Sequence, residues 1–271
     1  MVSPSHGYRT PAWGFTAGGA VGVLGGLVGL GGAEFRLPLL IGLFAFAALA
    51  AVIINKAMSL IVVTAAIPAR LLGVPFSEIS VEWAVVLNLL AGSLAGAWIG
   101  ASWATRARTA TLYRVLAALL VIIAIVFAAS HWQIIPPVTL TGTTLVVFGV
   151  LAGFGIGVVA AIMGVAGGEL LIPTITILYA VDVKVAGSLS LLVSLPTMIV
   201  AFFRYSRSQA FVVLREQKWF VLAMAGGSIV GTIIGGVLVG YVPSSVITPI
   251  IVALLLLSAW KVLGHAKQDR V

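Results

Sequence analysis

The fold is decided by two stretches of ten residues, GLGGAEFRLP at residues 29–38 and GVAGGELLIP at residues 164–173. The stretches align at an offset of 135, and four residues recur, namely Gly29, Gly32, Glu34 and Pro38 in the first and Gly164, Gly167, Glu169 and Pro173 in the second. Self-similarity at a fixed distance indicates a structural repeat.

Two further matches, in the same order, support a duplication. GSLAGAWIG at 92–100 aligns with GSIVGTIIG at 227–235 at the same offset. AMSL at 57–60 aligns with AGSL at 186–189 at an offset of 129, so the first copy carries six extra residues before this point. We interpret the chain as two copies of one unit, because chance similarity between glycine-rich apolar segments would not preserve this order.

The composition is that of an integral membrane protein. Hydrophobic residues make up 61% of the 271 residues and charged residues only 8%, whereas soluble domains carry about 25% charged residues. Residues 115–168 and 219–260 contain no charged residue, and about 20 apolar residues suffice for one crossing. Backbone groups in lipid must be satisfied internally, and the alternation of a barrel is absent, so an all-α membrane protein is predicted.

Each repeat is predicted to contain about five membrane segments, giving 8–10 in total. The predicted segments are 12–31, 37–54, 57–73, 83–104 and 112–130 in the first half, and 141–163, 170–181, 185–203, 219–240 and 246–263 in the second. Twelve helical residues reach only about 18 Å, so 170–181 is interpreted as a half-helix. The resulting division is an N-terminal tail (1–11), two repeats (12–131 and 132–263) and a C-terminal tail (264–271).

The basic residues distinguish two topologies. If every segment crosses once, the second repeat is inverted, and twelve basic residues lie inside, namely Arg9, Lys56, Arg106, Arg108, Arg114, Arg204, Arg207, Arg215, Lys218, Lys261, Lys267 and Arg270. Only Arg36, Arg70 and Lys184 then lie outside. If the short segments re-enter instead, the basic loops 106–114 and 204–218 fall on opposite faces. Cytoplasmic loops are rich in Lys and Arg, so inverted repeats with both termini cytoplasmic are favoured.

The duplicated glycine break is the predicted binding site for a small anion. Glycine weakens a helix and permits close approach of a ligand, and a helix N-terminus offers free N–H donors and partial positive charge. Two such termini would bind an anion with little or no fixed positive charge. The candidate binding residues are Gly31, Gly32, Ala33, Glu34, Gly167, Gly168 and Glu169, with Ser59, Ser188, Ser93, Ser228 and Asn55 as further candidates.

Several of these residues also have simpler structural interpretations. Glu34 and Glu169 are candidates for proton coupling, because a carboxyl group away from water favours its protonated form, but a glutamate at a helix start also complements the helix dipole. Asn55 could cap its helix. Arg36, Arg70 and Arg204 are expected to extend to the membrane interface, with a role in gating the anion as the alternative for each. The glycines spaced by four residues are interpreted as helix-packing positions, namely Gly92, Gly96, Gly100, Gly149, Gly153, Gly157, Gly227, Gly231 and Gly235.

No catalytic, metal or nucleotide motif is present in the sequence. There is no cysteine, and His6, His131 and His265 lack ligand spacing. The phosphate-binding pattern G-x-x-x-x-G-K-[ST] is missing. Neither a cofactor nor a metal is expected. The net charge of +8 is explained by loops between membrane segments, so nucleic acid is not an expected partner.

The stretches GLVGLGGAEFRLPLL (26–40) and AAIMGVAGGELLIPTI (160–175) resemble the paired signature of the sulfite exporter TauE/SafE family, also called the toluene-sulfonate uptake permease family. The resemblance covers roughly residues 14–263. It implies a transporter of sulfite, sulfonates or related organosulfur anions in the bacterial inner membrane. Lipid and a small anion are the expected partners, and proton coupling and a homodimer remain open. An anion channel of the same design and an intramembrane enzyme that uses the two glutamates are the alternatives.

Overall fold

A computed structural model describes residues 9–28, 32–73, 80–131, 140–238 and 244–268. The helices of the first repeat are α1 (Pro11–Val28), α2 (Ala33–Gly42), α3 (Ala48–Gly73), α5 (Trp83–Ala104) and α6 (Thr109–His131). Those of the second are α7 (Gly142–Met163), α8 (Gly168–Tyr179), α9 (Val183–Tyr205), η2 (Gln209–Phe211), α10 (Val212–Glu216), α11 (Lys218–Leu238) and α12 (Ser244–Gln268). Helices α3, α5, α6, α7, α9 and α11 are long and apolar enough to cross a membrane.

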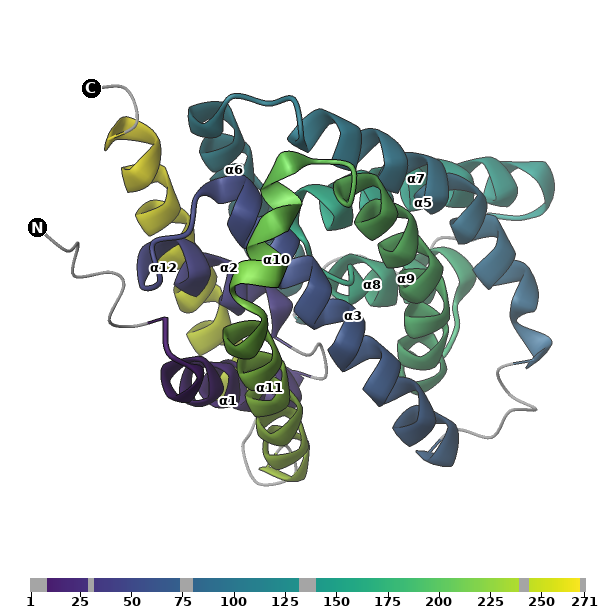
Figure 1. Cartoon of the computed structure of the whole chain (residues 1–271). Helices are drawn as coiled ribbons and strands as arrows, with labels where there is room; N and C mark the ends of the chain where they lie inside the picture. The colour runs from purple at the N-terminus through teal and green to yellow at the C-terminus, as the bar shows by residue number, and fades with distance from the viewer. Residues whose placement is uncertain (1–8, 29–31, 74–79, 132–139, 239–243, 269–271) are drawn as a thin grey trace, which may run out of the picture.

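The two repeats are intertwined (Figure 1). Helix α1 packs against α11 of the other repeat, and α7 packs in the same way against α5. Exchanging the repeats also converts the α5–α9 contact into the α11–α3 contact, and the α12–α2 contact into the α6–α8 contact. This correspondence confirms two inverted repeats, with the two short helices α2 and α8 at equivalent places.

Glycine seams allow the intertwined helices to approach closely. A Cβ atom on Gly96 would overlap the backbone carbonyl oxygen of Phe154 in α7, and one on Gly231 would overlap the carbonyl oxygen of Gly19 in α1. Backbone atoms of the facing helix also crowd Gly92, Gly100, Gly153, Gly157, Gly227 and Gly235, whereas a Cβ atom on Gly149 would meet the side chains of Tyr179 and Asn88. The predicted packing role of the glycines at four-residue spacing is therefore confirmed, and α1 contributes Gly18, Gly22 and Gly26 to the second seam.

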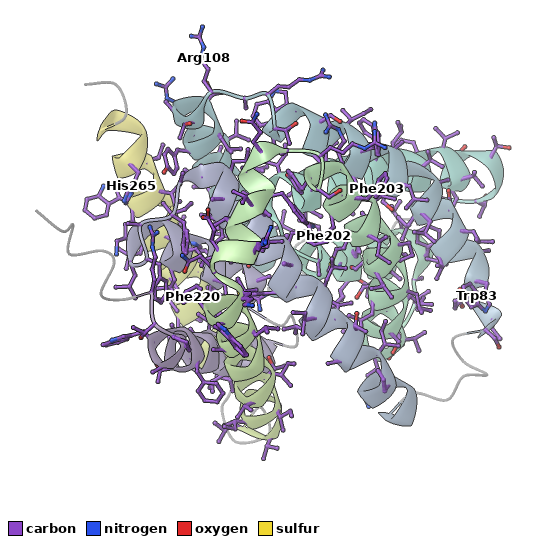
Figure 2. All side chains as sticks on the ribbon, in the orientation of Figure 1. Trp83, Arg108, Phe202, Phe203, Phe220 and His265 are labelled. Carbon is purple, nitrogen blue, oxygen red and sulfur yellow. The ribbon has the colours of Figure 1, made fainter. Side chains whose placement is uncertain are left out.

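Two basic connections lie at the same end of the helical bundle. The Nε atom of Arg204, in the last turn of α9, donates to Ser102 Oγ near the end of α5 at 2.7 Å. The α5–α6 and α9–α10 connections accordingly both lie at the top of the view in Figure 1. Figure 2 shows Arg108 projecting outward there. This is the arrangement of the five-segment inverted topology and not of the re-entrant alternative.

The predicted segments 37–54 and 57–73 are wrong. The short helix α2 ends at Gly42, and α3 runs without interruption from Ala48 to Gly73, through the expected break at Lys56. The actual turn is stabilised by tertiary contacts, because Arg9 donates to the carbonyl oxygens of Phe44 and Ala45 at 2.8 and 2.7 Å. The sequence around this turn is apolar and offers only Gly42 as a local signal.

The corrected boundaries give each repeat one half-helix. Helix α2 has ten residues and α8 has twelve, which confirms the half-helix predicted at 170–181 and adds its counterpart. Relative to the shared A-x-S-L segment, α3 begins six residues earlier than α9. The six extra residues of the first copy therefore lengthen the N-terminal end of α3.

Candidate functional site

Both half-helices begin at a glycine in the left-handed conformation. Gly32 has φ 72° and precedes α2, and Gly167 has φ 88° and precedes α8. A Cβ atom on Gly32 would lie 2.5 Å from the carbonyl oxygen of Val21, in the middle of α1. One on Gly167 would lie 3.2 Å from the Cβ of Ala160 in α7. Each half-helix thus starts part of the way along the first long helix of its own repeat. Gly31 lies outside the described residues.

The first turns of the two half-helices meet through their glutamates. Glu34 and Glu169 are 1% and 4% exposed. With both carboxylates ionised neither can donate, and none of their four oxygens has a hydrogen-bond partner among the described residues. A proton on the pair allows a side-chain hydrogen bond between Glu34 and Glu169. The first turns of α2 and α8, far apart in sequence, therefore lie close together at one buried carboxyl pair.

Arg36 is buried beside this pair, so the prediction that it extends to the membrane interface is wrong. Its side chain is 1% exposed. The Nε atom donates to Asn55 Oδ1 at 3.2 Å and Nη2 donates to Ser59 Oγ at 2.8 Å. The Nη1 atom has no hydrogen-bond partner within the part of the chain that the structure describes. A guanidinium group with one free donor edge is thus held at the start of α2.

Asn55 and Ser59 connect both glycine breaks to α3. Asn55 Nδ2 donates to the carbonyl oxygens of Ala33 and Met163, at 2.9 and 3.2 Å. Ser59 Oγ donates to the carbonyl oxygen of Gly164 at 3.3 Å. Because Asn55 lies inside α3 and not at its end, the capping interpretation is wrong. Its amide instead satisfies the carbonyl group of Met163, which the end of α7 leaves free, and joins it to the first turn of α2 through Ala33.

Lys56 is fully buried and was not predicted as a site residue. Its Nζ atom donates to the carbonyl oxygens of Ala160 and Val165, at 2.8 and 2.6 Å. A cation suits this place, because the last carbonyl groups of α7 carry partial negative charge. An ionisable residue inside a membrane helix is a functional candidate by default. The boundaries predicted from the sequence placed Lys56 in a loop between two segments, so this rule was not applied to it.

Both buried cations at the site, Arg36 and Lys56, belong to the first repeat. The second repeat has Leu171 in the place of Arg36 and Val185 in the place of Lys56, although Ser188 matches Ser59. The expectation of an anion site with little or no fixed positive charge is therefore wrong. The site combines two inverted half-helices with an asymmetric pair of buried cations.

The remaining predicted serines are buried but are not hydrogen-bonded to Arg36 or the glutamates. Ser93 Oγ lies 2.8 Å from Thr197 Oγ1, which the sequence did not indicate. Ser188 donates to the carbonyl oxygen of Lys184 in its own helix at 3.5 Å. Ser228 Oγ is buried without a partner. Within the described ranges no group of three His, Cys, Asp or Glu side chains could hold a metal ion.

The fold and the buried site define a multi-pass helical membrane protein with inverted repeats and interrupted helices, an architecture typical of secondary transporters. The family model described as Sulfite exporter TauE/SafE matches residues 2–127 and 149–270, and the chain belongs to this family. The family is one of transporters, and the two matched segments correspond to the two repeats. No curated protein and no solved structure matches the chain.

Proposed function

We propose that the chain is a secondary transporter of a small sulfur-containing oxyanion, sulfite or a sulfonate, and not an enzyme. The observation that carries this proposal is the buried Nη1 donor of Arg36 beside the start of α2, for which the described residues offer no acceptor. A buried donor without a partner costs about 1–3 kcal/mol. An oxyanion at this place would remove that cost.

The chemistry of the site suits an oxygen-rich anion. A guanidinium group offers several N–H donors in a planar arrangement that matches oxyanions. The N-termini of α2 and α8 add partial positive charge and free backbone donors. Glu34 and Glu169 disfavour the anion when both are ionised, so they are candidates for carrying a proton.

Inverted repeats support alternating exposure of the site to the two sides of the membrane. Because the half-helices belong to different repeats, a rotation of one repeat against the other would open the cluster on alternate sides. Membership of the family favours the bacterial inner membrane. With Arg36 and Lys56 now placed inside helices, the remaining basic residues still favour cytoplasmic termini.

Counterflow in proteoliposomes tests the proposal. Vesicles loaded with unlabelled sulfite should take up labelled sulfite saturably, and Arg36→Gln should reduce this uptake at least about tenfold through loss of a charged hydrogen-bond donor. Arg108→Gln is the control, because Arg108 projects away from the bundle (Figure 2). Ohmic currents would indicate a channel instead, and full activity of Arg36→Gln would exclude the assigned site.

A further inference from the structure

We infer that the Glu34–Glu169 pair takes up one proton together with each bound anion, so that proton and anion travel in the same direction. This inference rests on the proposed function. It adds the relative direction in which proton and anion move, and it assigns the proton to a site shared by the two repeats.

The geometry of the pair suits a single shared proton. Glu34 and Glu169 come from different repeats and are both buried, and no group in the described ranges donates a hydrogen bond to either carboxylate. The two side chains interact directly, so one added proton allows one carboxyl group to donate to the other, whereas two ionised carboxylates side by side repel each other. The proton therefore joins the starts of α2 and α8.

Two cations act on the pair from neighbouring elements. Arg36 of α2 interacts electrostatically with both glutamates, and Lys56 of α3 interacts with Glu169. The other described basic side chains on helices that pack against α2 or α8 lie nearer the helix ends, namely Arg114, Lys184, Arg204, Lys261 and His265. Tyr179 of α8 forms a hydrogen bond with Asn88.

The charge of this cluster determines the sign of the coupling. With two carboxylates and two cations ionised, the cluster is neutral, and an anion at Arg36 Nη1 faces two negative groups. One proton on the pair gives the cluster a net charge of +1, which favours the anion. Because coupling between two ligands is reciprocal, the bound anion favours the proton equally. Proton and anion therefore bind together and leave together.

The test measures anion binding by the purified full chain, with methanesulfonate as the probe. This anion stays ionised where sulfite would itself titrate, so any dependence on pH comes from the protein. Calorimetry in buffers of different ionisation enthalpy gives the number of protons taken up. We expect about one proton per anion, and an affinity that falls about tenfold for each pH unit above the range in which the free pair holds its proton.

Variants locate the proton. Glu169→Gln and Glu34→Gln mimic a protonated carboxyl, so each should bind methanesulfonate without proton uptake and with an affinity independent of pH. Glu216→Gln, at an exposed position in α10, should behave as wild type. The wild-type measurement needs no variant and remains decisive if a variant does not fold.

The outcomes separate this inference from the function on which it rests. Binding without proton uptake, or with proton release, would overturn the shared direction and leave an anion transporter. Unchanged proton uptake by both glutamine variants would place the proton elsewhere. If methanesulfonate does not bind and sulfite counterflow is also absent, the proposed function fails together with the inference.

Discussion

The Nζ atom of Lys56 lies 2.6 Å from the carbonyl oxygen of Val165, across the boundary between the two repeats. Lys56 belongs to α3 of the first repeat, and Val165 to the glycine break of the second. The second repeat has Val185 in the place of Lys56, so it cannot make the reciprocal contact. The starts of α2 and α8 are therefore held by different contacts, although each helix begins after a glycine in the left-handed conformation.

Replacing Lys56 tests this contact. Lys56→Met retains an unbranched side chain but removes the charged donor from the carbonyl groups of Ala160 and Val165. The carbonyl group of Ala160 keeps the backbone N–H of Val165, and we expect a cost of about 2–4 kcal/mol. We expect a lower Tm in detergent and reduced uptake of sulfite. Lys184→Met is the matched control, because Lys184 is exposed near the start of α9. Equal Tm values for the two variants would contradict the importance of the contact.

Asn55 should be more important for stability than the chain's other asparagine. Asn55→Ala removes hydrogen bonds to Ala33 and Met163 and one from Arg36, and we expect a loss of about 2–3 kcal/mol. Asn88→Ala removes one bond, to Tyr179, and should cost about 1 kcal/mol. Denaturation of both variants in mixed micelles gives the comparison, and the reverse order would show that Asn55 does not hold the breaks together.

The glycine seam between α5 and α7 predicts a strong dependence on side-chain size. Gly96→Ala would bring a Cβ atom against the carbonyl group of Phe154, so the helices must separate, at a cost of about 1–3 kcal/mol. Gly155→Ala places its Cβ in open space and should leave Tm unchanged or slightly higher, since alanine favours a helix over glycine. Equal changes of Tm in the two variants would mean that the close packing against Phe154 does not limit side-chain size at Gly96.

The inverted topology predicts which loops share a side of the membrane. The chain contains no cysteine, so single cysteines can be introduced without first replacing native ones. Arg108→Cys and Ser206→Cys should react equally with an impermeant maleimide in vesicles of one orientation, because their loops lie at the same end of the bundle. Lys184→Cys should show the opposite accessibility. Labelling of Arg108→Cys and Ser206→Cys from opposite sides of the membrane would contradict the inverted topology and support the re-entrant one.

Much of the architecture could be predicted from local features. The duplicated motif with Glu34 and Glu169 indicated two equivalent breaks, and the shortness of 170–181 indicated a half-helix. The start of α3 could not be predicted, because its turn depends on Arg9 and on aromatic contacts such as that of Phe44 with Phe220, with ring centroids 4.8 Å apart. A turn that is stabilised from distant parts of the chain leaves little local signal.

By itself the sequence determined the all-helical membrane class, the two repeats, the packing glycines and the presence of a glutamate at each break, because hydropathy, residue size and repetition act locally along the chain. Only the tertiary structure decided that Arg36 and Lys56 are buried and that their partners come from distant segments. The physical reason is that a buried charge is tolerated only where specific donors, acceptors or opposite charges surround it. Those partners are brought together by the crossing of the two inverted repeats.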